Sequence, residues 1–160
     1  MRRLRVMGLV VPMIVGALSL GAVAHAAAPK FHSASSGVDD DGALVVSFDE
    51  RGLGNGDVDY TLTADGDATY ACINRGGKNP SASNKRSVNQ EVSAGGTFSP
   101  RNGRVRESLT AGPPSPGDFS CPGGQRMVLA DVSYTNIVLT DTTNGVSISV
   151  ADASRTFFDV

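Results

Sequence analysis

The chain has 160 residues, a formal net charge of −2, 40% hydrophobic residues, 19 glycines and two cysteines. This length corresponds to one domain with a core of ordinary size once a leader is removed. A mildly acidic chain has no general electrostatic attraction to nucleic acid, so we expect no nucleic-acid partner.

Residues 1–26 are predicted to be a cleaved signal peptide. Three arginines lie within the first five residues, an apolar stretch follows, and Ala24-His25-Ala26 is a small-x-small cleavage motif. The alternative is an uncleaved membrane anchor, because about 20 apolar residues span a bilayer. Pro12 and the alanine-rich end favour cleavage. The mature chain would carry −5 (−2 minus the three leader arginines) and no transmembrane segment, and we expect it to be secreted, either extracellular or associated with the cell wall.

The mature chain is predicted to begin with a flexible tail over residues 27–42, which are small, polar and without periodicity. A single β-domain over 43–160 is predicted to follow, because apolar and polar residues alternate with period two. The predicted strand segments are 44–48, 58–64, 68–73, 87–94, 97–98, 105–109, 127–139, 146–150 and 156–160.

Turn and loop signals separate these segments. Asp65-Gly66 is predicted to turn the chain, Asn102-Gly103 suits a hairpin turn, and residues 141–145 form another turn. Residues 111–125 hold four prolines and four glycines, which predicts a long loop.

About eight short strands at roughly ten-residue spacing predict an antiparallel β-sandwich of immunoglobulin-like type. A closed barrel is the alternative. Tyr70-Ala71-Cys72 has the spacing of a tyrosine corner, but it precedes the first cysteine, and the chain has no tryptophan. We therefore expect Tyr70 and Cys72 to be two inward residues of one strand.

Cys72 and Cys121 are predicted to form a disulfide, because two cysteines in an exported chain generally pair. A catalytic thiol would need a histidine partner, and His32, the one histidine left after cleavage, lies in the predicted tail. Two cysteines cannot supply the four ligands of a structural zinc site.

Signals for catalysis are weak. No G-x-S-x-G motif occurs, and no pair of carboxylates is singled out by its context. The acidic run before Gly42 fails the spacing of an EF-hand calcium loop. We therefore expect no enzymatic activity, no metal and no cofactor.

Residues 75–106 carry seven basic side chains against one acid, a local charge of +6. We expect the acidic outer faces of neighbouring strands to neutralise this block in the fold. The alternative is a surface for an anionic partner, for example an anionic wall polymer or another secreted protein. Arg75, Lys78, Lys85 and Arg86 are the candidate residues, because the predicted disulfide ties their loop to the proline-rich loop.

The chain resembles a group of uncharacterised exported proteins from actinobacteria, over nearly all of the mature chain. The resemblance rests on VSFDERGLGNGDVDYTLTADGDATYACINRGGKNPSASNK, on FSCPGGQRMVLADVSYTNIVLTDTTNG and on the closing RTFFDV. It implies export, the disulfide and an all-β domain. It brings no activity, ligand or catalytic residue.

The sequence thus predicts a secreted, non-catalytic β-sandwich with a binding or structural role outside the cell or at the cell envelope. One alternative is an inhibitor of another secreted protein that acts through the loop 111–124. The other is a small extracellular hydrolase, which would need two carboxylates converging in a concave pocket.

Overall fold

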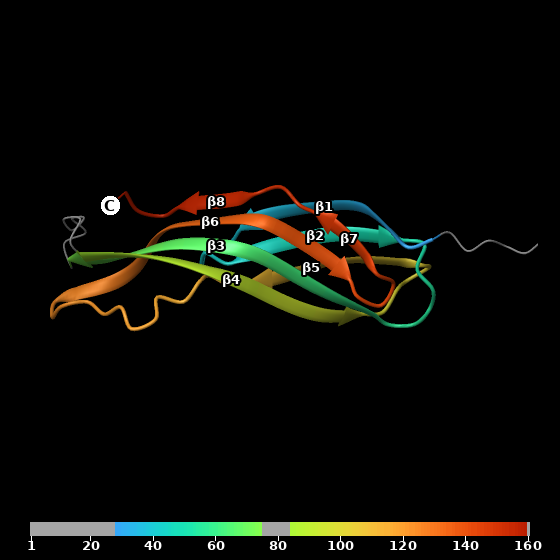
Figure 1. Cartoon of the computed structure of the whole chain (residues 1–160), viewed down its shortest axis with the longest axis horizontal. Coiled ribbons are helices and arrows are strands. Elements are labelled where there is room, and N and C mark those ends of the chain that lie inside the picture. Colours follow the sequence, from blue (N-terminus) through green and yellow to red (C-terminus); the bar gives the residue numbers. More distant parts are fainter. Residues whose placement is uncertain (1–27, 75–83, 160) are drawn as a thin grey trace, which may run out of the picture.

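The computed structural model describes residues 28–74 and 84–159, and this part of the chain is all β (Figure 1). A three-stranded antiparallel sheet has the order β1-β2-β5, and a five-stranded antiparallel sheet has the order β4-β3-β6-β7 with β8 also paired to β6. The strands are β1 (Lys30–Val38), β2 (Leu44–Arg51), β3 (Val58–Asn74), β4 (Lys85–Phe98), β5 (Arg104–Ala111), β6 (Gln125–Asp141), β7 (Val146–Ser149) and β8 (Ala153–Thr156).

The two sheets pack face to face as a sandwich, which confirms the predicted all-β class and strand number. Inward residues of both sheets, such as Leu44, Tyr60, Leu62 and Leu139, are buried in one shared core. Likeness to the immunoglobulin fold stays a prediction. The predicted signal peptide lies outside the described residues.

The disulfide between Cys72 and Cys121 is confirmed, with a Cα–Cα distance of 5.5 Å. It joins the end of β3 to the proline-rich loop before β6. Figure 1 shows β3, β4 and β6 extending past the three-stranded sheet toward one end of the molecule. The proline-rich loop lies against this extension: Pro114 is fully buried, and the Tyr70 hydroxyl donates a hydrogen bond of 2.5 Å to its carbonyl oxygen.

The predicted flexible tail over 27–42 is wrong for its central part, which forms β1. This strand pairs with β2 from Lys30 opposite Arg51 to Val38 opposite Leu44, so the sandwich begins before residue 43. Phe31 is its apolar anchor, with its ring edge-on to Phe48 at a centroid distance of 6.1 Å. Ladder hydrogen bonds and the Phe31 ring stabilise β1, and its Ala34 and Val38 also pack against the core.

The predicted turn at Asp65-Gly66 is also wrong, because β3 runs unbroken through it. Its ladder with β6 shifts register between Thr63 and Asp65 instead. Gly66 has a packing role: a Cβ placed there would lie 2.7 Å from Cγ of Pro114 and 3.2 Å from the Tyr134 ring. The glycine lets the proline-rich loop approach the sheet closely.

Asn102 and Gly103 do form a tight turn, with φ of 52° and 71°. Arg101 and Arg104 exchange backbone hydrogen bonds of 2.8 and 3.2 Å across it. The predicted hairpin is nevertheless wrong, because β4 and β5 then diverge into different sheets. The turn carries the chain from one layer of the sandwich to the other.

The last strand lies earlier than predicted, at Ala153–Thr156 rather than at 156–160. It pairs with β6 from Asp131 opposite Thr156 to Tyr134 opposite Ala153. Arg155 donates to the carbonyl of Val38 and forms an ion pair of 2.8 Å with Asp40. These contacts link β8 to the end of β1 and to the turn that follows it.

Candidate functional site

The predicted basic block over 75–106 is divided between the two ends of the molecule. Lys85 and Arg86 begin β4, opposite Ala71 and Tyr70. The arginines at positions 101, 104 and 106 lie beyond the other end of β4, roughly 40 Å away at about 3.3 Å per residue. Arg75 and Lys78 are outside the described residues, so the loop that they were predicted to form is not part of the site described below.

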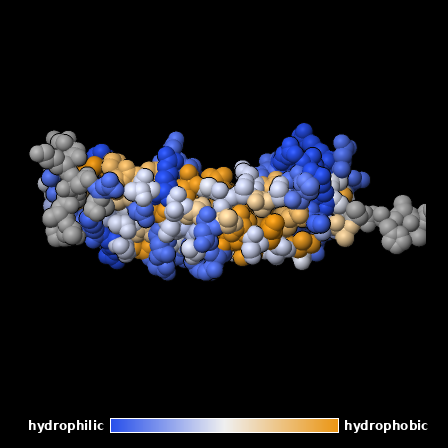
Figure 2. Space-filling model, turned by 90° about the horizontal axis from the view of Figure 1, so that it is seen from above, coloured by the Kyte–Doolittle hydropathy of each residue, from blue (hydrophilic) through white to orange (hydrophobic). Residues whose placement is uncertain are grey.

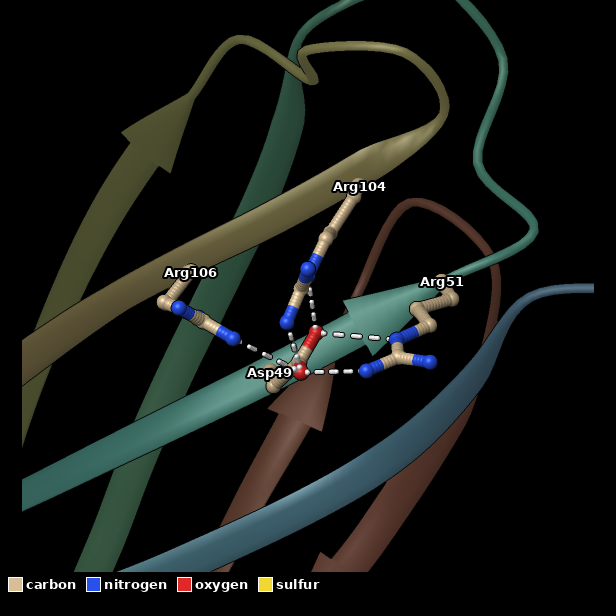
Figure 3. A network of polar contacts seen from close by, with 4 residues as sticks. All are labelled: Asp49, Arg51, Arg104 and Arg106. Carbon is tan, nitrogen blue, oxygen red and sulfur yellow. Dashed lines mark hydrogen bonds and ion pairs between the residues drawn. The ribbon is translucent and has the colours of Figure 1, made fainter.

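The second group of arginines meets β2 on the outer face of the three-stranded sheet. In the β2–β5 ladder Asp49 is opposite Arg106, and Arg51 is opposite Arg104. Residues at i and i+2 of a strand point to the same face, so all four side chains are on one side of the sheet. Figure 3 shows the three arginines pointing toward the Asp49 carboxylate. We call this group, Asp49 with Arg51, Arg104 and Arg106, the arginine face.

Asp49 is bound unequally by its three neighbours. Arg104 donates from Nε to Oδ1 over 2.7 Å and from Nη2 to Oδ2, which is a bidentate pair. Arg51 donates from Nη2 to Oδ2 over 3.0 Å and from Nε to Oδ1 over 3.4 Å. Arg106 makes only an ion pair of 3.7 Å, and its side chain is 70% exposed.

These contacts hold the Asp49 carboxylate in its ionised form. Hydrogen bonds from Arg104 and then Arg51 hold the pKa of Asp49 well below its usual range, although burial opposes them. The pKa of Arg104 is raised in turn by its bond to Asp49. The structural role of Asp49 is to keep the three guanidiniums together and oriented.

The arginine face has an excess of positive charge and of hydrogen-bond donors. Three guanidiniums and one carboxylate leave a net charge of +2. Each guanidinium has about five N–H donors and a carboxylate accepts about four hydrogen bonds, so most donors have no acceptor within the cluster. Acidic neighbours are expected from the sequence to neutralise the basic block. Within the arginine face, Asp49 neutralises one of the three positive charges.

Shallow hollows and hydroxyl groups surround the arginine face. One hollow of about 340 Å³ is lined by Arg101, Arg104, Arg106, Ser99 and Glu107. Another of about 280 Å³ contains Ser33, Ser35 and Ser47 beside Asp49 and Arg106. Figure 2 shows strongly hydrophilic residues gathered at the right-hand end of the molecule, where β2 ends and β5 begins in Figure 1. This is a wide, open, cationic surface rather than an enclosed pocket.

The structure also brings together two carboxyl groups, Glu50 and Asp141, but in the core. Both have an exposed fraction of 0%. The Tyr60 hydroxyl donates to Glu50, and Asn144 donates to Asp141 from its backbone and side-chain amides. The pair predicted for a hydrolase would face a substrate cleft, whereas no solvent reaches these two groups. Among residues 28–74 and 84–159, no group of three or more His, Cys, Asp or Glu is arranged to hold a metal ion.

The proline-rich loop is anchored to the rest of the molecule at several points. Besides Pro114, Phe119 packs against the core, and the Ser115 amide donates to Oε1 of Gln90 in β4. The disulfide at Cys121 anchors its far end. The loop therefore covers part of the sheet of its own molecule, while Gly117, Asp118 and Ser120 between the anchors are exposed. An inhibitory role for this loop stays a prediction.

No family model, no curated protein and no solved structure matches this chain. Its function therefore has to follow from its own residues. Within the described part of the chain, no helix has the length and apolar character needed to cross a bilayer.

Sequence reasoning missed the arginine face for a definite reason. Asp49 and Arg104 are 55 residues apart, and only the β2–β5 register brings them together. The local signal was present as two alternating patterns, Asp-Glu-Arg at 49–51 and Arg-Val-Arg at 104–106. In strands, such spacing places the charged ends of each pattern on one face.

Proposed function

We propose that the protein is a secreted, non-catalytic β-sandwich that binds an anionic partner outside the cell or at the cell envelope through the arginine face. The observation that carries this proposal is the imbalance at Asp49: three guanidiniums surround one carboxylate on an exposed sheet face. The predicted signal peptide supports export. The disulfide supports it too, since such bonds persist in oxidising compartments.

The recognition would rest on charge-assisted hydrogen bonds. The planar guanidinium fork matches carboxylate, sulfate and phosphate groups, and two adjacent strands hold these forks in fixed positions. Serine hydroxyls at 33, 35 and 47 add donors and acceptors along the same face. An open surface of this kind suits a polyanion lying across the strands, and an anionic wall polymer is the partner that we propose first. The resemblance to exported actinobacterial proteins agrees with export only, and it remains a prediction.

The proposal is tested by binding of the mature protein to the cell-wall fraction of its native cells. The test variant is Arg101→Gln with Arg106→Gln, because both side chains are exposed and Asp49 keeps its bonds to Arg51 and Arg104. The matched control is Lys85→Gln with Arg86→Gln, which removes the same charge from the other end of β4. We expect the test variant to lose about tenfold in affinity, and the wild type to lose affinity as salt rises.

Two outcomes would refute the proposal. One is equal retention of the wild type and the test variant. The other is loss of binding in the control alone, which would place the site at Lys85 and Arg86.

A further inference from the structure

The outer face of the five-stranded sheet carries the opposite charge to the arginine face. Its outward positions in β3, β4 and β6, over the central residues 59–69, 87–97 and 131–140, include no lysine or arginine; the outward row of β4 reaches Lys85 only beyond this part. They include five acids, for a charge of −5: Asp59, Asp65, Asp67, Glu91 and Asp131. We call these five residues the acidic face. Since the two sheets are the two layers of one sandwich, the acidic face and the arginine face point in opposite directions.

The acidic face contains an unfavourable pair within one molecule. Asp65 is directly opposite Glu91 in the β3–β4 ladder, and Asp67 follows two residues along the same face. Like charges directly opposite each other destabilise a sheet. No ion pair to these three side chains is present among the described residues. No cationic side chain among the described residues therefore compensates this repulsion.

Among the described residues, neutral groups donate hydrogen bonds to four of these five carboxylates. Asn89 donates to Asp67 over 2.8 Å, and Asn136 donates to Asp65 over 2.8 Å. Thr97 donates to Asp59 and Thr156 donates to Asp131. These bonds orient the carboxylates without cancelling their charge, and each carboxylate retains acceptor sites toward solvent.

The two faces also match in spacing. Asp65 and Asp67 are at i and i+2 of β3, and Arg104 and Arg106 are at i and i+2 of β5, so each pair is about 6.8 Å apart. One face offers guanidinium donors and the other offers carboxylate acceptors, at the same repeat along a strand. A bidentate pair between guanidinium and carboxylate is among the strongest charge-assisted contacts in proteins.

We propose that a second copy of this chain is an anionic partner of the arginine face, and that it docks by its acidic face. The proposal rests on the proposed function, because it uses the same arginine face and names its occupant. The contact is heterologous: each copy uses one face toward one neighbour and keeps the other face free. Copies therefore add one upon another into open stacks, and the association does not stop at a symmetric dimer.

The test is sedimentation velocity of the mature protein in EDTA, at about 20 mM and about 500 mM salt, where screening lengths differ several-fold. One variant weakens the arginine face and the hollow beside it, Arg101→Gln with Arg106→Gln. The other weakens the acidic face, Asp65→Asn with Asp67→Asn and Glu91→Gln, and it keeps the amide-to-oxygen hydrogen bonds. In an equimolar mixture each variant keeps intact the face that is weakened in the other.

We expect the wild type to form a concentration-dependent series of oligomers at low salt that dissociates at high salt. Each variant alone should be monomeric, and the mixture should form one-to-one complexes that grow no further. A monomeric wild type at low salt, or a mixture that does not associate, would overturn the proposal. So would oligomers that appear only when calcium replaces EDTA, since a metal would then bridge the acids.

Failure of this proposal is distinguishable from failure of the proposed function. The acidic-face variant should still bind the wall fraction like the wild type, because its arginine face is intact. If that variant binds the wall while the mixture stays monomeric, the arginine face has an anionic partner other than a second copy.

Discussion

The hydroxyl of Tyr60 donates a hydrogen bond of 2.7 Å to Oε2 of Glu50 in the interior of the sandwich. Oε1 of the same carboxyl group has no hydrogen-bond partner among the described residues. A buried, ionised carboxylate is unfavourable in such surroundings. Burial first, and then the nearby charge of Asp141, raise the pKa of Glu50 to about 7.

We expect the free energy of unfolding to fall as pH rises through neutrality. The pKa of Glu50 in the folded protein is above its ordinary value of 4.5, so the folded state binds more protons than the unfolded chain between pH 4.5 and about 7. The stabilisation is complete below pH 4.5 and is lost as pH rises through about 7. Urea unfolding at a series of pH values measures this slope.

Glu50→Gln is the matched variant for this slope. The amide keeps an acceptor for Tyr60 and supplies a neutral N–H in place of the carboxyl proton. We expect the variant to lose the fall in stability across this window and to exceed the wild type above pH 7. A wild-type profile that is already flat here would show that Glu50 is not the titrating group.

Asp49→Asn should change stability and binding in opposite directions. The variant loses charged hydrogen bonds at a side chain that is only 7% exposed, so we expect a loss of about 1–3 kcal/mol in the free energy of unfolding. At the same time the net charge of the arginine face rises from +2 to +3, so retention on a polyanion column should increase. Denaturant unfolding and salt elution measure the two effects. Weaker retention of a folded variant would mean that Asp49 orients the arginines in a way that charge alone does not replace.

Gly66→Ala should destabilise the extension of the sheet under the proline-rich loop. Its Cβ would lie 2.7 Å from Pro114, closer than packed atoms tolerate, and the loop would have to shift. We expect a loss of about 1–3 kcal/mol. Gly37→Ala is the control, because a Cβ at this strand glycine meets nothing within 4 Å. Equal thermal midpoints for the two variants would argue against close packing of Pro114 on β3.

Removing the disulfide by Cys72→Ala with Cys121→Ala should lower the free energy of unfolding by about 4 kcal/mol in the chain-entropy description. The two cysteines are 49 residues apart, so the bond closes a long loop. Limited proteolysis should then cut the proline-rich loop before the rest of the chain, because Pro114 and Phe119 are then the main apolar anchors of the loop. Uniform cleavage along the whole chain would contradict this local role.

The sequence predicts a strand correctly wherever one face of that strand is buried and the other is exposed to solvent. Alternation predicted β2, the first half of β3, β6 and β7, because period two is a direct consequence of strand geometry. The disulfide followed from cysteine number and predicted export. β1 was missed because serine, alanine and glycine alternate in no visible way, and its stability comes from ladder bonds and Phe31.

Contacts between distant segments could not be predicted in the same way. The charge block at 75–106 was visible, but nothing local indicates that Arg104 pairs with Asp49 rather than with a neighbour on β4. The turn at Asn102-Gly103 was recognisable by its residues. That it leads into the other sheet depends on how β2 and β5 pack, which is a property of the whole core.

The turn at Asn102-Gly103 also determines which way the charges of β5 face. Val105 is buried, and Arg104 and Arg106 on either side of it point outward. The two-residue length of the turn therefore determines which side chains of β5 face the core and which face solvent. One extra residue there, if transmitted along β5, would place the guanidiniums inside and the valine in water. The length of this short link therefore sets the polarity of one side of the molecule.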